Sequence, residues 1–341
     1  MSLDQSLQQQ VIDYLKIVIP SSQSLADIFI SDLSVSKSTA YKKIKCQVGI
    51  SMDELEILGN KYNIPISTFL GRTSDNIFSL DALELSPRHP IEYLQRIAIH
   101  FKSYLKYDDI EFIYISNMIP IFHLLQFPAL ITLKLYIWDI TNWKTEHSDD
   151  RSFSIRAYSD RLQDFEVARK QILDCYLKIK GIEIWNIRFL DILVEQFKYV
   201  LINRMLTDEA EIKIIIDQLK QLYHYLEQVA NEGLKYEVSA GKVSFKNDIA
   251  IYNNQVIEST NLIFGQSPQF SSVYSTLDTP NYMNCLSPEV ANLVKRWLDQ
   301  VIIHSFKISR EGKSERLRFF RELKSRLDFS FSEIDKILLS T

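Results

Sequence analysis

Apolar residues recur at intervals of three and four along most of this chain, which is the spacing of one face of an α-helix. The pattern is clear from Leu7 to Val18 and again from Ile212 to Val229. Between residues 234 and 285 the spacing changes to two, which is typical of strands. The sequence therefore predicts a mainly α-helical protein, with an N-terminal helical bundle followed by a larger α-rich α+β part that contains a small antiparallel sheet.

The chain has 341 residues, which is enough for two or three domains. Residues 71–90 are polar and end with two prolines, a composition that predicts a linker. We therefore expect a first domain over residues 1–71, a linker over 72–90 and a second domain over 91–341. The small β-meander is expected around residues 234–285, with hairpin turns at residues 246–248 and 253–254.

The expected helices follow from caps, prolines and apolar spacing. Ser51 with Glu54, and Ser330 with Glu333, have the spacing of capping boxes. A short alternation at residues 110–115 predicts a strand. The stripe from Ile212 to Val229 is too short for a coiled coil, so we expect it to face the core. The helices are predicted over residues 5–19, 24–33, 37–45, 52–62, 90–105, 128–139, 159–180, 187–206, 208–232, 287–306 and 314–327.

Composition excludes several classes of protein. The three cysteines are far apart, with no pair at CxxC spacing, which excludes a disulfide framework and a cysteine-based zinc site and favours a reducing cytoplasm. No secretory signal is recognised at the start. The apolar window from Ile113 to Trp138 is interrupted by polar residues and prolines, so we expect buried core and no membrane partner. The net charge of −4 gives no general attraction to nucleic acid.

The segment from Phe29 to Lys45 contains the parts of a helix-turn-helix. An apolar helix ends at Leu33, Val35 points inward from a short turn, and Ser36 is suited to cap a second helix. Within that second helix, Ala40 and Ile44 are four residues apart and form the expected buried seam.

The other side of this second helix is basic. No acidic residue lies between Ser36 and Gln47, so positive charge is concentrated on the helix that would enter a major groove. Lysines there can meet phosphates or guanine edges. The alternative interpretation is an ordinary solvated helix face. The outward residues are predicted to be Lys37, Ser38, Tyr41, Lys42 and Lys45.

The order of these parts resembles the lambda repressor-like helix-turn-helix family of bacterial regulators. By that family's pattern, the resemblance implies that Lys37, Ser38 and Lys42 reach base edges, while Tyr41 and Lys45 lie nearer the DNA backbone. The chain departs from the pattern at Ile30, where a small residue is usual, and at Ser34, where the turn normally has Gly. The resemblance covers residues 5–71 and rests on Ser24-Leu25-Ala26, Leu33-Ser34-Val35-Ser36, Lys37-Ser38-Thr39-Ala40-Tyr41 and Tyr62-Asn63-Ile64-Pro65-Ile66-Ser67.

The resemblance implies a cytoplasmic, sequence-specific transcriptional regulator that binds double-stranded DNA. One small domain contacts few bases, so we expect a homodimer, held through the second domain, which is also a candidate effector domain. An alternative is a protein-interaction or structural module without DNA binding. A third hypothesis is an enzyme with an active site in the second domain, which a buried pair of perturbed titratable groups would favour.

Catalytic and metal motifs are not found in the sequence. The six histidines show no HExxH or closely spaced ligand pair, and no P-loop, GxSxG or GxGxxG occurs. We therefore expect no enzyme activity, no cofactor and no metal. From Lys295 to Ser325 basic residues outnumber acidic ones, which would suit a phosphate-bearing ligand or a further contact with the DNA backbone. A solvated helix face is the favoured interpretation, with these residues turned inward: Leu317, Phe319, Phe320 and Leu323.

Overall fold

The computed structural model describes residues 6–19, 24–62, 64, 89–145, 152–162, 164–238, 244–256 and 261–340. The chain divides into two compact units, each of which is described by itself. The first comprises Met1–Ile77 with Leu286–Glu289, and the second comprises Phe78–Cys285 with Val290–Thr341. The expected linker over residues 72–90 lies outside the described residues, apart from His89 and Pro90.

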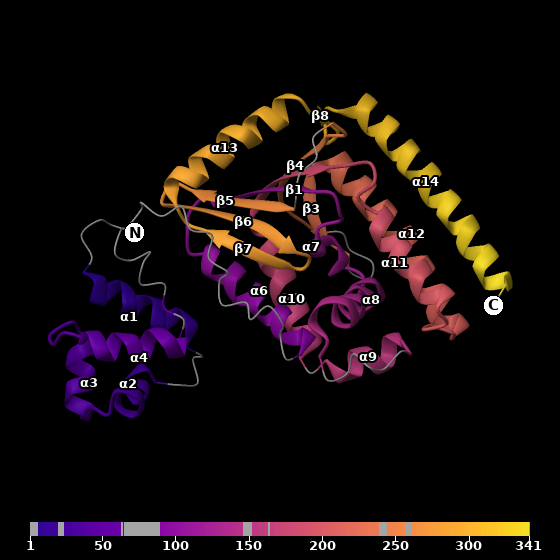
Figure 1. Ribbon diagram of the computed structural model, residues 1–341. Coiled ribbons are helices and arrows are strands. Elements are labelled where there is room, and N and C mark those ends of the chain that lie inside the picture. Colours follow the sequence, from indigo (N-terminus) through magenta and orange to yellow (C-terminus); the bar gives the residue numbers. More distant parts are fainter. Residues whose placement is uncertain are drawn as a thin grey trace. The chain divides into compact units, whose positions relative to one another are not determined.

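Short capped helices build the first unit (Figure 1). The Ser36 hydroxyl accepts from the Thr39 amide at the start of the third helix. The predicted capping box is present at the fourth, where the Ser51 amide donates to Glu54 at 2.7 Å and the Glu54 amide donates to Ser51 at 3.2 Å. The helices are α1 (Leu7–Val18), α2 (Leu25–Leu33), α3 (Lys37–Ile44) and α4 (Met52–Tyr62).

An apolar core joins these four helices. Leu15, Phe29, Ala40 and Leu58 are fully buried and come from α1, α2, α3 and α4 in turn. The turn between α2 and α3 passes through Ser34, whose φ of 52° and ψ of 37° place it in the left-handed region that favours glycine.

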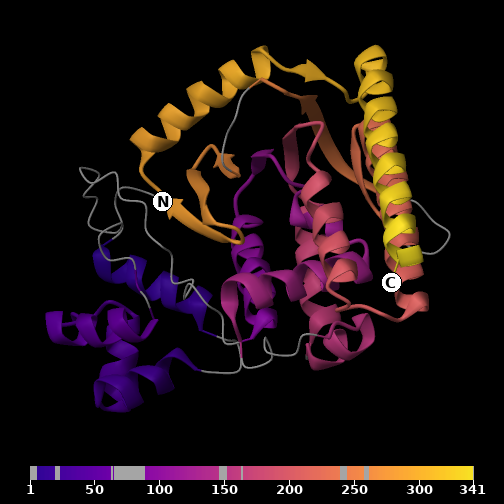
Figure 2. The ribbon, with the colours of Figure 1, turned by 45° about the vertical axis from the view of Figure 1, so that its right-hand side comes forward.

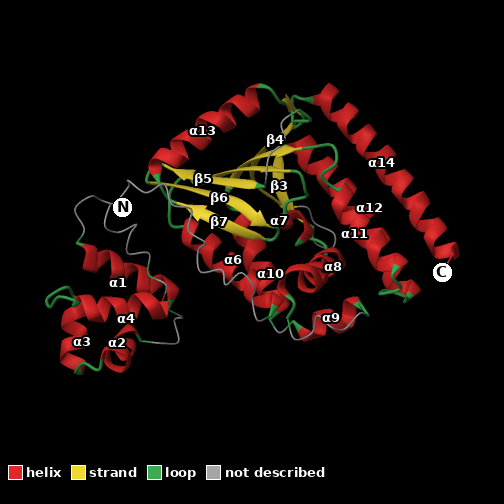
Figure 3. Cartoon of the chain, in the orientation of Figure 1, coloured by secondary structure: helices red, strands yellow, loops and turns green. Residues whose placement is uncertain are grey.

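The second unit is an eight-stranded mixed sheet with helices on both faces (Figure 3). The helical elements are α6 (Pro90–Tyr104), α7 (Ile121–Leu124), α8 (Pro128–Trp138), a π-helical turn (Asp139–Trp143), α9 (Ile155–Arg161), α10 (Phe165–Tyr176), α11 (Asp191–Ile202), α12 (Glu209–Glu232), α13 (Pro288–Ile303) and α14 (Lys313–Ser340). The strands are β1 (Glu111–Ser116), β2 (Lys180–Trp185), β3 (Leu234–Glu237), β4 (Ser244–Asn253), β5 (Leu262–Ser267), β6 (Phe270–Asp278), β7 (Asn281–Cys285) and β8 (Phe306–Lys307).

The strand order is β3-β4-β2-β1-β5-β6-β7, with β8 paired to β4. Strands β1, β2 and β4 are parallel neighbours, and helices in the intervening chain connect them. Strands β5, β6 and β7 form an antiparallel meander that joins the sheet where β5 pairs with β1. In the parallel part, Ile113 lies opposite Ile182 and Tyr114 lies opposite Glu183.

The prediction of a small antiparallel sheet was wrong in extent and in strand direction. The meander is present, but it is one side of a mixed sheet whose parallel centre includes β2, a strand that was not predicted. The expected hairpin turn at residues 246–248 is also wrong, because β4 runs unbroken from Ser244 to Asn253. Its polar residues pair through the backbone, with Asn247 opposite Lys235 and Asp248 opposite Leu234.

The two faces of the sheet carry separate cores. Ile113, Ile115 and Ile184 pack on one face with Leu298 and Val301 of α13. The opposite face bears the larger core, which includes α6, α8, α10, α11, α12 and α14. Figures 1 and 2 show α13 alone on its side of the sheet and the other long helices on the opposite side.

Two predictions concern the long helices of the larger core, and one of them is confirmed. The α12 stripe from Ile212 to Val229 is buried, as predicted for a core-facing helix. By contrast, α14 continues without a break to Ser340, so a capping box at Ser330 and Glu333 does not form. Glu333 instead accepts a hydrogen bond from Lys198 of α11. Among the described residues, no helix combines the length and apolar character needed to cross a bilayer.

Candidate nucleic-acid interface

The structure exposes all five predicted contact residues, four on the outer side of α3 and Lys45 at its C-terminal cap. Lys37, Ser38, Tyr41, Lys42 and Lys45 are exposed, and the Tyr41 side chain is 47% accessible. Ala40 is buried and Ile44 is half-buried against the core, as the predicted seam requires. The helix therefore has an apolar inner side and a basic outer side.

The remaining lysine of α3 has a different role. Lys43 is 5% exposed, and its Nζ donates to the Glu54 carboxylate at 2.7 Å and to the Gly49 carbonyl at 2.6 Å. Burial alone would raise the pKa of Glu54, but Lys43 and the Ser51 amide lower it overall. This ion pair links the end of α3 to α4. Lys43 therefore stabilises the unit and does not belong to the exposed basic surface.

Gln8 holds the segment that follows α3 against α1. Its Nε2 donates to the carbonyls of Lys43 and Val48, each at 2.8 Å, and its Oε1 accepts from the Ile50 amide at 3.2 Å. These bonds fix the path of the backbone around Lys45. The outer side of α3 is thus presented on a rigid support rather than on a free loop.

Asp32 joins the end of α2 to α4. Its carboxylate accepts from Lys61 at 2.6 Å and from the Tyr62 hydroxyl at 2.7 Å. Burial alone would raise the pKa of Asp32, but these donors lower it overall. Partial burial, together with the Asp32 carboxylate, raises the pKa of Tyr62 to about 12. The helix before the turn is therefore held in place independently of the outer side of α3.

The outer side of α3 offers donors suited to an anionic polymer. Within the described part of the chain, Lys37, Lys42 and Lys45 make no ion pair, so their charges face solvent. Ammonium groups can contact phosphates or guanine edges, while Ser38 and Tyr41 add hydroxyls and one aromatic ring. The spacing along a single helix suits entry into a major groove.

Sequence reasoning missed a buried ionisable cluster in the second unit. Glu183 of β2 is 2% exposed, and its carboxylate accepts from His123 Nε2 at 2.8 Å, Trp185 Nε1 at 2.7 Å and the Tyr176 hydroxyl at 2.7 Å. Burial alone would raise the pKa of Glu183, but His123 and the other donors lower it to about 2. The available signal was an acid between two isoleucines in a short apolar run.

Lys235 of β3 belongs to the same cluster. Its Nζ donates to the Ile179 carbonyl at 2.7 Å and to the Tyr176 carbonyl at 3.2 Å, and it lies 3.8 Å from the centre of the Tyr176 ring. A Cβ at Gly181 would lie 3.1 Å from this ammonium group, so glycine leaves the room it needs. Burial lowers the pKa of Lys235 to about 7, although Glu183 acts in the opposite direction.

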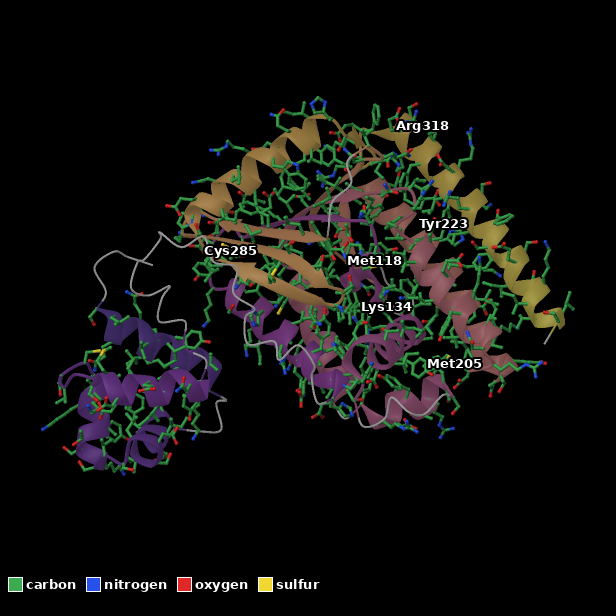
Figure 4. All side chains as sticks on the ribbon, in the orientation of Figure 1. Met118, Lys134, Met205, Tyr223, Cys285 and Arg318 are labelled. Atoms are coloured by element: carbon green, nitrogen blue, oxygen red, sulfur yellow. The ribbon has the colours of Figure 1, made fainter. Side chains whose placement is uncertain are left out.

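This cluster belongs to the core, apart from the cavity between α6 and the meander. The described residues that line the cavity between α6 and the meander do not include Glu183, His123 or Lys235. Lys134 lies on the buried helix α8 (Figure 4). Burial lowers its pKa to about 8, and its Nζ donates to Gln196 at 2.8 Å.

One residue of the basic stretch near the C-terminus is buried within the unit. Arg316 is 8% exposed and donates to the carbonyls of Ile308 and Arg310. Phe319, Phe320 and Leu323 point inward as predicted, whereas Leu317 is 54% exposed, so its predicted burial was wrong. Leu317 lies one residue after the buried Arg316 and so falls on the solvent side of α14.

Among the described residues, no group of three or more His, Cys, Asp and Glu side chains is placed to hold a metal ion. Comparisons with protein-family models, with curated proteins and with solved structures found no match to this chain.

Proposed function

We propose that this protein is a sequence-specific DNA-binding transcriptional regulator that uses α3 as its recognition helix. The proposal rests on the different exposure of the lysines in and next to α3. Lys43 is buried with Glu54, while Lys37, Lys42 and Lys45 face solvent. The three outward lysines can contact phosphates, while the inward lysine keeps the helix bonded to the rest of the unit.

In this proposal Lys37, Ser38 and Lys42 read base edges, and Tyr41 and Lys45 contact the backbone. The protein acts in the cytoplasm as a homodimer held through the second unit, because two half-sites give the selectivity that one small domain lacks. This arrangement resembles that of lambda repressor-like regulators.

The test is in vitro selection from a random duplex library with the purified full-length protein, followed by fluorescence anisotropy at two salt concentrations. We expect an enriched, roughly palindromic motif. Lys42→Ala should weaken binding and change the preferred bases. The matched control is Lys16→Ala, which removes an exposed lysine from α1 instead.

An interaction module that binds a protein partner would behave differently. It would enrich no motif and show no steep salt-dependent affinity for DNA, since that dependence arises from displaced counterions. Equal binding by Lys42→Ala and the wild type would likewise contradict the assigned role of α3.

A further inference from the structure

The second unit has a pocket that the proposed DNA contact does not use. It has a volume of about 390 Å³ and lies among α8, α9 and the start of α10 (Figure 1). Volumes of about 300–1,000 Å³ are typical of sites for small molecules. The apolar wall of the pocket includes the buried Leu162 and Phe165 and the half-buried Ile155. The pocket therefore has room for a small ligand and an apolar surface for it to contact.

Thr132 of α8 lines this pocket with a hydroxyl that the fold does not use. The residue is 1% exposed, and among the described residues its Oγ1 has no hydrogen-bond partner. Ser159 of α9, the other hydroxyl-bearing residue of the described lining, instead donates to the Ile155 carbonyl at 2.6 Å. Burial of a hydroxyl without a partner is unfavourable, because the group loses its hydrogen bonds to water. A ligand that reaches Thr132 with a polar group would restore the missing bond.

The same pocket is lined by acidic side chains. The described lining includes Asp160, Asp164 and Glu166 and no basic residue. Asp164 has the N-cap position of α10, but it makes no capping hydrogen bond and no ion pair with a described residue. The Asp160 carboxylate lies 3.9 Å from the Arg156 guanidinium, and both side chains are exposed, so this contact is weak. Glu166 is paired with Arg169, which leaves Asp160 and Asp164 to attract a cation.

The arrangement of these acids favours an extended organic cation over a metal ion. Among the described residues, no three or more His, Cys, Asp and Glu side chains converge so as to hold a metal. Asp160 belongs to α9 and Asp164 precedes α10, with the buried Leu162 between them in the chain. A cation whose ammonium groups are joined by methylene segments can pair with both acids. Its methylene segments can also lie on the apolar wall, as the stems of long charged side chains do.

We propose that this pocket binds a linear polyamine. The ammonium groups of the ligand lie on Asp160 and Asp164, its methylene segments contact Leu162 and Phe165, and one ammonium N–H donates to the Thr132 hydroxyl. Hydrogen bonds between ammonium groups and carboxylates are charge-assisted and stronger than neutral ones. The pocket lies within the second unit and includes no residue of α3, so its occupancy is measured without DNA and is independent of the proposed function.

The test is isothermal titration calorimetry of spermidine with the full-length protein, at low ionic strength and without DNA. We expect saturable binding at one site. Asp164→Asn should weaken this binding about fivefold, as expected for the loss of one exposed ion pair. Magnesium chloride should bind more weakly than spermidine, because a point charge cannot reach both acids. Equally tight binding of Mg²⁺, or no saturable binding of spermidine at millimolar concentration, would overturn the proposal.

Asp174→Asn is the matched control for Asp164→Asn. Asp174 lies near the other end of α10, its side chain is 48% exposed, and it is outside the described lining of the pocket. We expect this variant to bind spermidine as the wild type does. If both variants lose the same affinity, spermidine is attracted by the negative surface in general and the assigned site is wrong.

Thr132→Val tests the buried end of the pocket. The change removes the hydroxyl and keeps the shape of the side chain, so binding of spermidine should weaken about tenfold through the loss of a hydrogen bond to a charged group. Because the hydroxyl has no partner among the described residues, the midpoint of urea unfolding without ligand should be no lower than that of the wild type. A lower midpoint would mean that the fold itself uses the hydroxyl, and unchanged binding would mean that the ligand does not. Either result would overturn the proposal.

Discussion

The carboxylate of Glu183 lies 2.8 Å from Nε2 of His123, and both side chains are buried on the helix-rich face of the sheet. An ionised carboxylate only accepts hydrogen bonds, so Nε2 carries the proton. Tyr176 and Trp185 supply two further donors, which leaves the buried charge well satisfied. The acid therefore ties β2 to α7 and α10, and it does so beside Tyr114, its neighbour in register on β1.

Replacing this carboxylate should cost much of the stability of the second unit. Glu183→Gln replaces one of the two oxygens that accept from His123, Tyr176 and Trp185 with an amide NH2 group, and a buried donor left without an acceptor costs about 1–3 kcal/mol. The measurement is urea unfolding followed by tryptophan fluorescence, which reports this unit because the four tryptophans, Trp138, Trp143, Trp185 and Trp297, all belong to it.

The matched control for this change is Glu166→Gln. Glu166 pairs with Arg169 but its side chain is 63% exposed, so the same chemical change should cost well under about 1 kcal/mol. If both variants lose the same free energy of unfolding, the buried hydrogen bonds of Glu183 contribute no more to stability than an exposed ion pair does.

Lys235 predicts a pH dependence of definite sign. Burial lowers its pKa from 10.5 to about 7, so between these values the unfolded chain holds a proton that the folded chain has released. The free energy of unfolding should therefore rise with pH in this window, by up to about 1.4 kcal/mol per pH unit. Urea unfolding at pH 7.5, 8.25 and 9 measures this slope.

Other groups also titrate near pH 9, so the slope is read as a difference from Lys235→Met. This variant keeps the length of the side chain and removes its titration. We expect the free energy of unfolding to change less with pH in the variant than in the wild type. The stability of the variant relative to the wild type should be greatest at pH 7.5. Parallel profiles would mean that Lys235 keeps an ordinary pKa.

Local spacing predicted most helices, including the four of the first unit, but not the centre of the sheet. In α1 and α12 the apolar residues recur every three or four positions, so the sequence carries its own signal. The strand β2 is different, because it is only six residues long and its neighbours β1 and β4 are distant in sequence. Parallel pairing depends on tertiary contacts that no local pattern encodes.

The candidate sites divide in the same way. Exposure of Lys37, Lys42 and Lys45 follows from helical spacing alone. The burial of Lys43 could not be read from spacing, because it depends on Glu54, which lies eleven positions away on another helix. His123 and Glu183 are separated by sixty positions, so their contact exists only in the folded sheet.

Ser34 offers a stabilising substitution in the first unit. It has a left-handed conformation with φ of 52°, which costs an L-residue about 1–2 kcal/mol, whereas glycine adopts it freely. Ser34→Gly should raise the stability of the unit by up to about 1 kcal/mol, since the greater flexibility of glycine in the unfolded chain offsets part of the gain. Hydrogen exchange of the amides in α2 and α3 measures the change.

Ser38→Gly is the control for that substitution. It makes the same chemical change four positions later, inside α3, where glycine should destabilise the helix by about 1 kcal/mol. Loss of protection in both variants would show that the turn does not strain Ser34.

Neighbouring lysines of α3 should separate stability from DNA binding. Lys43→Ala leaves the largely buried Glu54 carboxylate without its cation, so amide protection in α3 and α4 should fall by about 3 kcal/mol. Lys42→Ala and Lys45→Ala remove exposed charges and should change protection by no more than about 0.5 kcal/mol. In anisotropy titrations on a selected duplex, Lys45→Ala should weaken binding nearly uniformly across sequences and reduce the salt slope by about 1, while Lys42→Ala also alters base preference. Should Lys42→Ala and Lys45→Ala instead lose protection as Lys43→Ala does, the outer lysines support the fold and α3 is not a free recognition surface.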